Sequence, residues 1–160
     1  MARKLDVVTN VIAIATCLLA SAVLLQKLDL LPRRSPAGAV ELRTGAVLPA
    51  AWQVSTNAGV PTVVAVVRST CHFCTESMPF YRDLVRKPVR LVAVSDEPRE
   101  VTRAYFVAHG VEPAQIVSAR PAGISGTPTL FAVDAAGRIR DRQVGLLSAE
   151  KQQQFLSAIR

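Results

Sequence analysis

The sequence predicts an α/β fold in which a mixed β-sheet is flanked by helices. Two runs rich in β-branched residues, at 60–67 and 89–94, are typical of strands buried on both faces. Each run is followed by a segment whose apolar residues recur at helical spacing. Near the end of the chain, the turn at 134–137 ends in Gly137 and separates two further strand patterns, as in a β-hairpin. Alternating strands and helices that end in a hairpin give a sheet with parallel and antiparallel pairs.

The segment at 27–59 leads into this sheet. It is punctuated by proline and glycine, and it predicts a small hairpin or an irregular cap in which Trp52 covers the edge of the sheet. The elements after it come in chain order: a strand at 60–67, a helix over 71–87, a strand at 89–94, a helix ending at His109, a strand at 115–118, strands at 129–133 and 138–144, and a final helix.

The ends of the predicted helices carry recognisable signals. Pro79 is expected to kink the first helix, because proline cannot donate a backbone hydrogen bond. Ser95 or Asp96 is expected to cap the second helix, and Gly110 to end it. Ser148 is expected to cap the last helix.

An uncharged apolar run lies near the N-terminus. As a helix, the twenty residues 7–26 span about 30 Å, the thickness of a bilayer's hydrocarbon core. They predict an uncleaved transmembrane signal-anchor. A cleaved signal peptide is the alternative, because Ala20-Ser21-Ala22 has the form of a cleavage site. Basic residues flank both ends of the run, so charge does not fix its orientation. Cys17, inside the run, is expected to pack there.

These features divide the 160-residue chain into a cytoplasmic tail at 1–6, the membrane span at 7–26, a linker at 27–41 and a domain at 42–160. Half of the residues are apolar and 19% are charged, which excludes a wholly disordered chain. The net charge of +7 comes from arginines without interleaved aromatic residues, so no nucleic-acid surface is predicted. Anionic lipid headgroups remain a partner that suits these charges.

The candidate catalytic residues are concentrated in Cys71-His72-Phe73-Cys74. This segment comes after a predicted buried strand and begins a predicted helix. Free backbone N–H groups at a helix N-terminus favour a thiolate, so Cys71 is the predicted nucleophile and Cys74 the resolving thiol. A zinc site would need two further ligands, and the sequence has no second cysteine pair. Two buried, unreactive cysteines are the other alternative. We expect a redox pair with no metal and no cofactor.

A second signal, Gly126-Thr127-Pro128-Thr129, stands immediately before a predicted strand. Together with the first strand, the cysteine pair and Pro79, it resembles the thioredoxin fold. The resemblance implies that the Thr127–Pro128 peptide bond is cis, that Pro128 packs beside the cysteine pair, and that the Thr127 backbone pairs with an extended substrate. Taken alone, Thr-Pro would only open an edge strand.

Finer features look like the membrane-anchored TlpA/ResA-like branch of this superfamily. They are the N-terminal anchor, the segment around Leu48-Pro49, the Met78-Pro79 pair, the strand and helix at 89–110, and the turn at 134–137. The resemblance implies a periplasmic, extracytoplasmic thiol–disulfide oxidoreductase, often a reductant of apocytochrome c or other secreted thiols. Its implied partners are protein thiols and disulfides, and a membrane or periplasmic protein that recycles the cysteine pair.

The sequence also departs from the family pattern. Thr70 stands where tryptophan is usual, Ala65 where thioredoxins often bury an acidic residue, and Ser77 where the branch usually has glutamate. Loss of the buried carboxylate removes the usual proton acceptor for the resolving thiol. The dipeptide His72-Phe73 is unusual in having neither glycine nor proline. A cationic His72 beside the first cysteine would make the pair more oxidising, whereas an exposed His72 would have little influence.

Two classes of function fit these observations. The first is an enzyme, a membrane-tethered oxidoreductase that exchanges disulfides with protein substrates. The alternative is a non-catalytic thioredoxin-like binding module, or a domain that delivers copper, because thiolates select Cu(I). A copper site would be indicated by a histidine near Pro128, and the sequence has none there.

Overall fold

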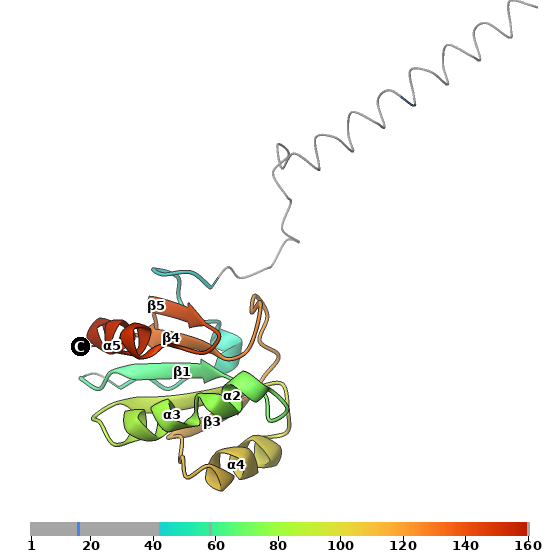
Figure 1. The fold of residues 1–160 in the computed structure, drawn as a ribbon. Coiled ribbons are helices and arrows are strands. Elements are labelled where there is room, and N and C mark those ends of the chain that lie inside the picture. The colour runs from blue at the N-terminus through green and yellow to red at the C-terminus, as the bar shows by residue number, and fades with distance from the viewer. Residues whose placement is uncertain (1–15, 17–41, 58, 160) are drawn as a thin grey trace, which may run out of the picture. The chain divides into compact units, whose positions relative to one another are not determined.

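The computed structural model of the chain describes Thr16 and residues 42–57 and 59–159 (Figure 1). The predicted membrane span at 7–26, apart from Thr16, and the predicted linker at 27–41 lie outside the described residues. Within those residues, no helix is both long and apolar enough to cross a bilayer. Residues 42–57 and 59–159 belong to one compact unit.

Within the described residues, a mixed sheet has the strand order β3-β2-β1-β4-β5, which confirms the predicted fold class (Figure 1). β1 pairs in parallel with β2, and β2 with β3, whereas β4 runs antiparallel to β1 and to β5. The strands are β1 (Thr62–Val66), β2 (Arg90–Ser95), β3 (Gln115–Ser118), β4 (Thr129–Val133) and β5 (Ile139–Val144). Every residue of β1 and β4 is buried, as expected of strands covered on both faces.

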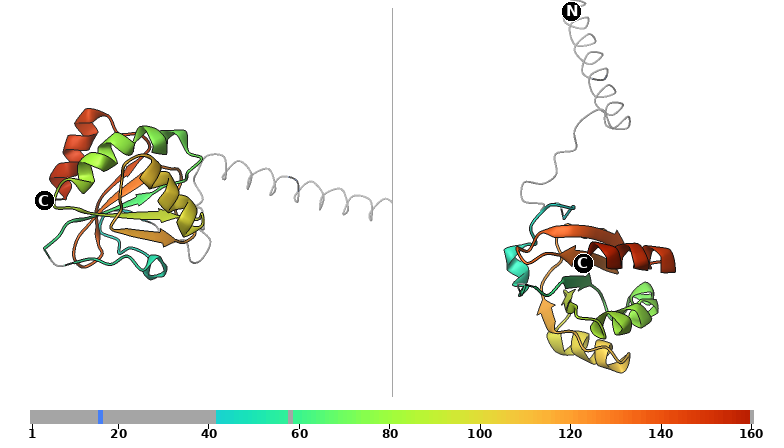
Figure 2. Two further views of the ribbon diagram at one scale, coloured as in Figure 1. Left: turned by 90° about the horizontal axis from the view of Figure 1, so that it is seen from below. Right: turned by 90° about the vertical axis from the view of Figure 1, so that its left-hand side faces the viewer.

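Helices cover one face of this sheet, and irregular backbone covers the other (Figure 2). The helices are α2 (His72–Glu76), α3 (Met78–Val85), α4 (Arg99–Ala108) and α5 (Ala149–Ala158). The chain crosses from β1 to β2 to β3 in one direction, so two right-handed crossovers place α3 and α4 on the same face. Residues 42–57, with the short 3₁₀ helix η1 (Ala50–Trp52), lie on the opposite face (Figure 2).

Trp52 covers a face of the sheet and not its edge, so that prediction was wrong. Its side chain is 1% exposed, and its ring lies 6.1 Å from that of Phe131, measured between centroids. Phe131 belongs to β4, which has a strand on either side. The physical reason is that this face of the sheet carries no helix, and apolar side chains from 42–57 bury it instead.

The predicted helix at 71–87 consists of α2 and α3, which meet at Ser77. The Ser77 N–H donates to the Phe73 carbonyl at 3.1 Å, and the Tyr81 N–H donates to the Ser77 carbonyl at 3.1 Å. Pro79 lies in the first turn of α3, where a missing N–H breaks no helical hydrogen bond. The chain is interrupted at Ser77, two residues before Pro79, so two separate helices stand where one kinked helix was predicted.

The expected cap of α4 was wrong. α4 begins after Pro98, which makes no side-chain capping bond. Ser95 is the last residue of β2, and its hydroxyl accepts a hydrogen bond from the Glu97 N–H at 3.2 Å. Asp96 pairs with Arg68. Ser95 is thus engaged in a local turn with Glu97, and Asp96 in a tertiary ion pair, so neither residue caps α4.

Three other predictions, two at helix ends and one in the β4–β5 turn, are confirmed. The Ser148 hydroxyl accepts a hydrogen bond from the Lys151 N–H at 3.4 Å and caps α5. Gly110 comes after α4 with a φ of +67°, and Gly137 lies in the β4–β5 turn with a φ of +75°. Both angles fall in the left-handed region, where glycine has no steric penalty.

Candidate active site

Cys71 and Cys74 lie where the chain leaves the end of β1 and turns into α2. Cys71 is the N-cap residue of α2, in an extended conformation with φ −87° and ψ 113°. Its side chain is partly exposed, whereas Cys74, one turn further on, is 0% exposed. Both residues are free thiols in the structure. A reactant that approaches from solvent therefore meets the sulfur of Cys71 first.

The sulfur of Cys71 has two polar contacts that define its surroundings. The Cys74 N–H donates to Cys71 Sγ at 3.2 Å, which favours negative charge on that sulfur. The Cys71 thiol donates to the carbonyl oxygen of Thr127 at 3.4 Å, across a separation of 56 residues. The Thr127–Pro128 peptide bond is cis, as the resemblance predicts, and Pro128 is buried. The structure therefore brings both predicted motifs together.

Cys74 lies in a different electrostatic environment. The pKa of its thiol is raised to about 12, chiefly by burial and then by its hydrogen bond with the Cys71 side chain. Burial disfavours the thiolate, because a charge loses the hydration that it would have in water. At neutral pH, Cys74 is therefore a thiol, and Cys71 is the better placed nucleophile.

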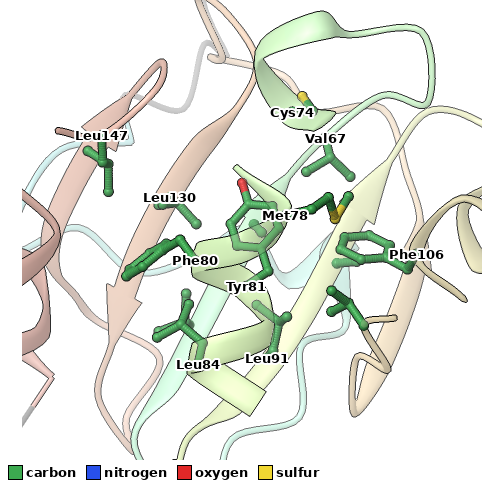
Figure 3. Close-up of a cluster of buried hydrophobic side chains, with 14 of the residues drawn as sticks. Val67, Cys74, Met78, Phe80, Tyr81, Leu84, Leu91, Phe106, Leu130 and Leu147 are labelled. Carbon is green, nitrogen blue, oxygen red and sulfur yellow. The ribbon is translucent and has the colours of Figure 1, made fainter. Parts of the chain in front are cut away.

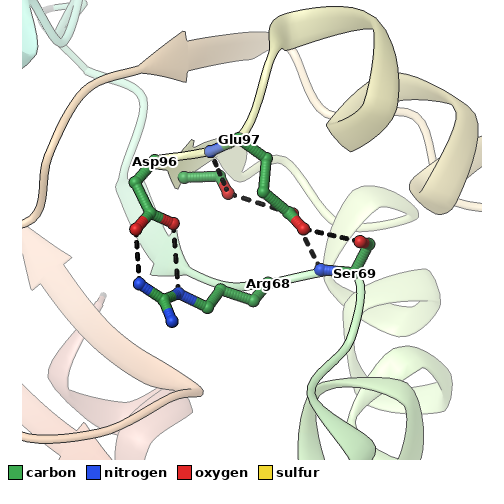
Figure 4. Close-up of polar contacts among 5 residues, drawn as sticks. Arg68, Ser69, Asp96 and Glu97 are labelled. Atoms are coloured by element: carbon green, nitrogen blue, oxygen red, sulfur yellow. Dashed lines mark hydrogen bonds and ion pairs between the residues drawn. The ribbon is translucent and has the colours of Figure 1, made fainter.

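A polar frame holds the loop that precedes the cysteine pair (Figure 4). The Glu97 carboxylate accepts hydrogen bonds from the Ser69 N–H at 2.8 Å and from the Ser69 hydroxyl at 2.6 Å. The Ser95 hydroxyl donates to the same carboxylate at 3.2 Å. Beside it, Arg68 and Asp96 form an ion pair, with Arg68 Nε 3.1 Å from Asp96 Oδ1. These contacts tie residues just before Cys71 to the end of β2.

His72 and Phe73 lie at the surface of α2. The His72 side chain is 78% exposed, and its Nε2 lies 3.1 Å from Oε1 of Glu76, one helical turn away. Phe73 is 54% exposed, and its ring centroid is 5.7 Å from that of His72. The structure thus places His72 beside a carboxylate, and a tuning effect of either residue on the cysteines remains a prediction.

A depression of about 310 Å³ lies next to the cis peptide bond. Thr127, Ser125 and the arginines Arg68 and Arg120 line it, together with neighbouring residues of the same loop. Asp96 also lines it and pairs with Arg68, so Arg120 supplies the net positive charge of the lining. Within residues 42–57 and 59–159, no group of three or more His, Cys, Asp or Glu side chains could hold a metal ion.

Sequence reasoning missed two groups near the cysteines, Glu97 and Tyr81. Glu97 comes just after β2, and the carboxyl ends of the parallel strands β1 and β2 meet at one edge of the sheet. This topology could have placed Glu97 close to Ser69. Tyr81 lies on the buried face of α3, where the apolar pattern of the helix concealed its hydroxyl.

Solved structures share this fold at low sequence identity. StoA from Bacillus subtilis superposes with a TM-score of 0.51 and 19% identity, covering 62% of this chain and 84% of its own. A thiol:disulfide interchange protein of the thioredoxin family from Chlorobium tepidum gives 0.52 and 19%, covering 63% of this chain and 80% of its own. A thiol-disulfide isomerase from Corynebacterium glutamicum gives 0.52 and 17%, covering 77% of this chain and 97% of its own.

The sequence itself identifies the family. No curated protein sequence matches the chain significantly. The profile of the thioredoxin-like domain matches residues 48–160, which include the cysteine pair and the cis proline. The match covers well over half of the chain, so the chain belongs to the thioredoxin-like domain family.

Proposed function

We propose that the chain is a membrane-tethered, extracytoplasmic thiol–disulfide oxidoreductase that exchanges disulfides with protein substrates through Cys71 and Cys74. The asymmetry of the pair is the observation that carries this proposal. The Cys71 sulfur is partly exposed and lies 3.4 Å from the Thr127 carbonyl, whereas Cys74 is fully buried one turn away. The fold shared with proteins named as disulfide interchange proteins and isomerases supports the same chemistry.

The proposed exchange has two steps. The Cys71 thiolate attacks one sulfur of a substrate disulfide, so that a bond between Cys71 and the substrate forms and the substrate S–S bond breaks. The other substrate sulfur leaves as a thiolate and takes up a proton. Cys74 then attacks the Cys71 sulfur, the Cys71–Cys74 disulfide forms, and the remaining substrate sulfur leaves. The proton that Cys74 gives up compensates the charge on this leaving thiolate. The substrate is reduced and the cysteine pair is oxidised.

Substrate would bind along the cis-proline loop. Thr127 is next to the exposed sulfur, and we assign its backbone to pairing with an extended substrate segment. The adjacent depression, with Arg68 and Arg120 in its lining, accommodates side chains that flank the substrate cysteine. The exposed Phe73 offers an apolar contact on the other side of Cys71.

The location of the domain is part of the proposal. The uncharged run at 7–26 is long enough to span a bilayer, and the whole thioredoxin-like domain comes after it in the sequence. We place the chain in the membrane-anchored TlpA/ResA-like branch, with the domain in the periplasm and a membrane or periplasmic protein recycling the pair. Tethering would keep the cysteine pair close to newly exported substrates.

Substrate trapping tests the proposed activity. In the Cys74→Ser variant the second step is blocked, so mixed disulfides between Cys71 and substrate proteins should accumulate and disappear on reduction. The matched control is Cys71→Ser, which keeps one cysteine of the pair but lacks the exposed nucleophile. No reducible complex in Cys74→Ser, or equal complexes in both variants, would contradict the proposal. Copper that copurifies with the wild-type chain and is lost in both variants would favour the binding-module alternative.

A further inference from the structure

Tyr81 is a buried tyrosine whose hydroxyl has no hydrogen-bond partner among the residues that the structure describes. Its side chain is 0% exposed and packs in the apolar cluster beneath α2 and α3. A buried hydroxyl without a partner costs stability, and phenylalanine would fill the same space without that cost. The hydroxyl therefore needs an explanation other than packing.

The orientation of Tyr81 aims this hydroxyl at the cysteine helix. Figure 3 shows its oxygen pointing toward the end of the cluster where Cys74 lies, and away from Leu84 and Leu91. The Tyr81 N–H donates to the carbonyl of Ser77, which joins α2 to α3, so its backbone is fixed relative to the cysteine helix. The tyrosine ring is held by aromatic contacts, with its centroid 6.2 Å from that of Phe106.

Few ionisable groups face Cys74 from the elements packed around it. In the described part of this cluster, they are Cys71 at the start of α2, Tyr81 on α3 and Tyr105 on α4. The Tyr105 hydroxyl already has a partner, the hydroxyl of Thr75 at 3.1 Å. β1 contributes only apolar side chains to the cluster, among them Ala65. Tyr81 is thus the one ionisable side chain here with an unused hydrogen-bond donor.

We propose that Tyr81 is a positioning residue whose hydroxyl donates a hydrogen bond to the Cys74 thiolate while Cys74 attacks the mixed disulfide. This inference rests on the proposed oxidoreductase function and assigns the group that assists its second step. A buried thiolate is poorly stabilised at this place, because burial outweighs the hydrogen bonds that the Arg68 backbone and the Thr127 side chain offer to the Cys74 sulfur.

In this role, Tyr81 keeps its proton throughout. Burial raises the pKa of its hydroxyl above the usual value, and negative charge on the Cys74 sulfur raises it further. Tyr81 is therefore a hydrogen-bond donor and not a base. The proton released by Cys74 passes through solvent to the leaving substrate thiolate, the Cys71–Cys74 bond forms, and the bond between Cys71 and the substrate breaks. No further reactant is required.

Rapid-quench kinetics on the full chain separate the two steps. The reduced chain is mixed with oxidised glutathione, quenched in acid at successive times over a range of pH, and the mixed disulfide and the Cys71–Cys74 disulfide are quantified by mass spectrometry. In Tyr81→Phe, we expect an unchanged first step, accumulation of the mixed disulfide, and a second step slowed about 10-fold. The pH profile of the second step should move upward by about one unit.

Tyr105→Phe is the matched control, because it removes a nearby hydroxyl that already bonds to Thr75, and both steps should keep wild-type rates. Urea unfolding of Tyr81→Phe beside wild type shows whether the variant is folded. Wild-type kinetics for Tyr81→Phe at every pH, or equal slowing of both steps, would overturn this inference alone. A wild-type chain that never forms the Cys71–Cys74 disulfide would overturn the proposed function, and the inference with it.

Discussion

At the scale of single residues, Cys71 and Cys74 differ because the start of α2 passes between surface and core. Cys71, before the first helical residue, keeps a partly exposed sulfur that accepts the Cys74 N–H. Cys74, three residues later, faces the apolar cluster under the helix. The Cys-x-x-Cys spacing at the beginning of a helix was enough to predict this order of exposure from the sequence.

This difference predicts the order in which the two thiols react. Iodoacetamide at mildly acidic pH, followed by peptide mapping of the reduced protein, should label Cys71 first. Since the pKa of Cys74 is raised to about 12, an increase of pH to about 9 should leave Cys74 a thiol. Cys74 should thus remain unlabelled until the protein unfolds, and in Cys71→Ser the folded chain should resist labelling at this pair. Preferential labelling of Cys74 would reverse the assigned roles.

At the scale of elements, the active-site loop is held by the residues just after β2. The parallel pairing of β1 and β2 brings Ser69 and Glu97 together, although 28 residues separate them. The carboxylate accepts three hydrogen bonds from this region. Because the Ser69 N–H is part of the backbone just before Cys71, Glu97 fixes the entry of the chain into α2.

Removal of this carboxylate should destabilise the folded protein. Glu97→Ala leaves the Ser69 N–H and hydroxyl without their acceptor, and we expect a loss of about 1–3 kcal/mol in the free energy of unfolding. Glu100→Ala is the control, since Glu100 is exposed on the first turn of α4 and its loss should cost less than about 1 kcal/mol. Urea unfolding of the reduced proteins measures both. If Glu97→Ala and wild type unfold with the same free energy, the hydrogen bonds of Glu97 contribute nothing to the stability of the fold.

The sequence predicts elements well where local signals and burial agree, and poorly where tertiary contacts decide. The runs that form β1 and β2 were recognisable because both faces of each strand are buried. The start of α4 was not, because the carboxylate of Asp96 pairs with Arg68, which the sheet brings close, and the hydroxyl of Ser95 bonds to Glu97 before the helix begins. Trp52 was assigned to the wrong surface for a similar reason, since nothing local indicates which face lacks a helix.

At the scale of the whole molecule, residues 42–57 and 59–159 form a thioredoxin-like unit with helices on one face of the sheet and irregular chain on the other. The cysteine pair and the cis proline are far apart in sequence, but they meet at the ends of β1 and β4, which are neighbours in the sheet. The family resemblance predicted this meeting, whereas spacing alone could not.

The tethering of the chain to a membrane and the location of its domain depend on the apolar run at 7–26, and both remain predictions. An alkaline phosphatase fused after residue 40 should be active, because the run at 7–26 is expected to carry the fused enzyme across the membrane. Carbonate washing should leave the full chain in the membrane fraction, because an uncleaved span is held by its apolar length. An inactive fusion would place the domain in the cytoplasm, and release by carbonate would favour the cleaved signal peptide.

The most direct test of the redox assignment is the state of the two thiols after mild oxidation and subsequent reduction. We predict that mild oxidation of the full chain removes both Cys71 and Cys74 from the pool of alkylatable thiols, that peptide mapping finds them joined to each other, and that dithiothreitol restores both. If both thiols can still be alkylated after oxidation, Cys71 and Cys74 are not a redox pair.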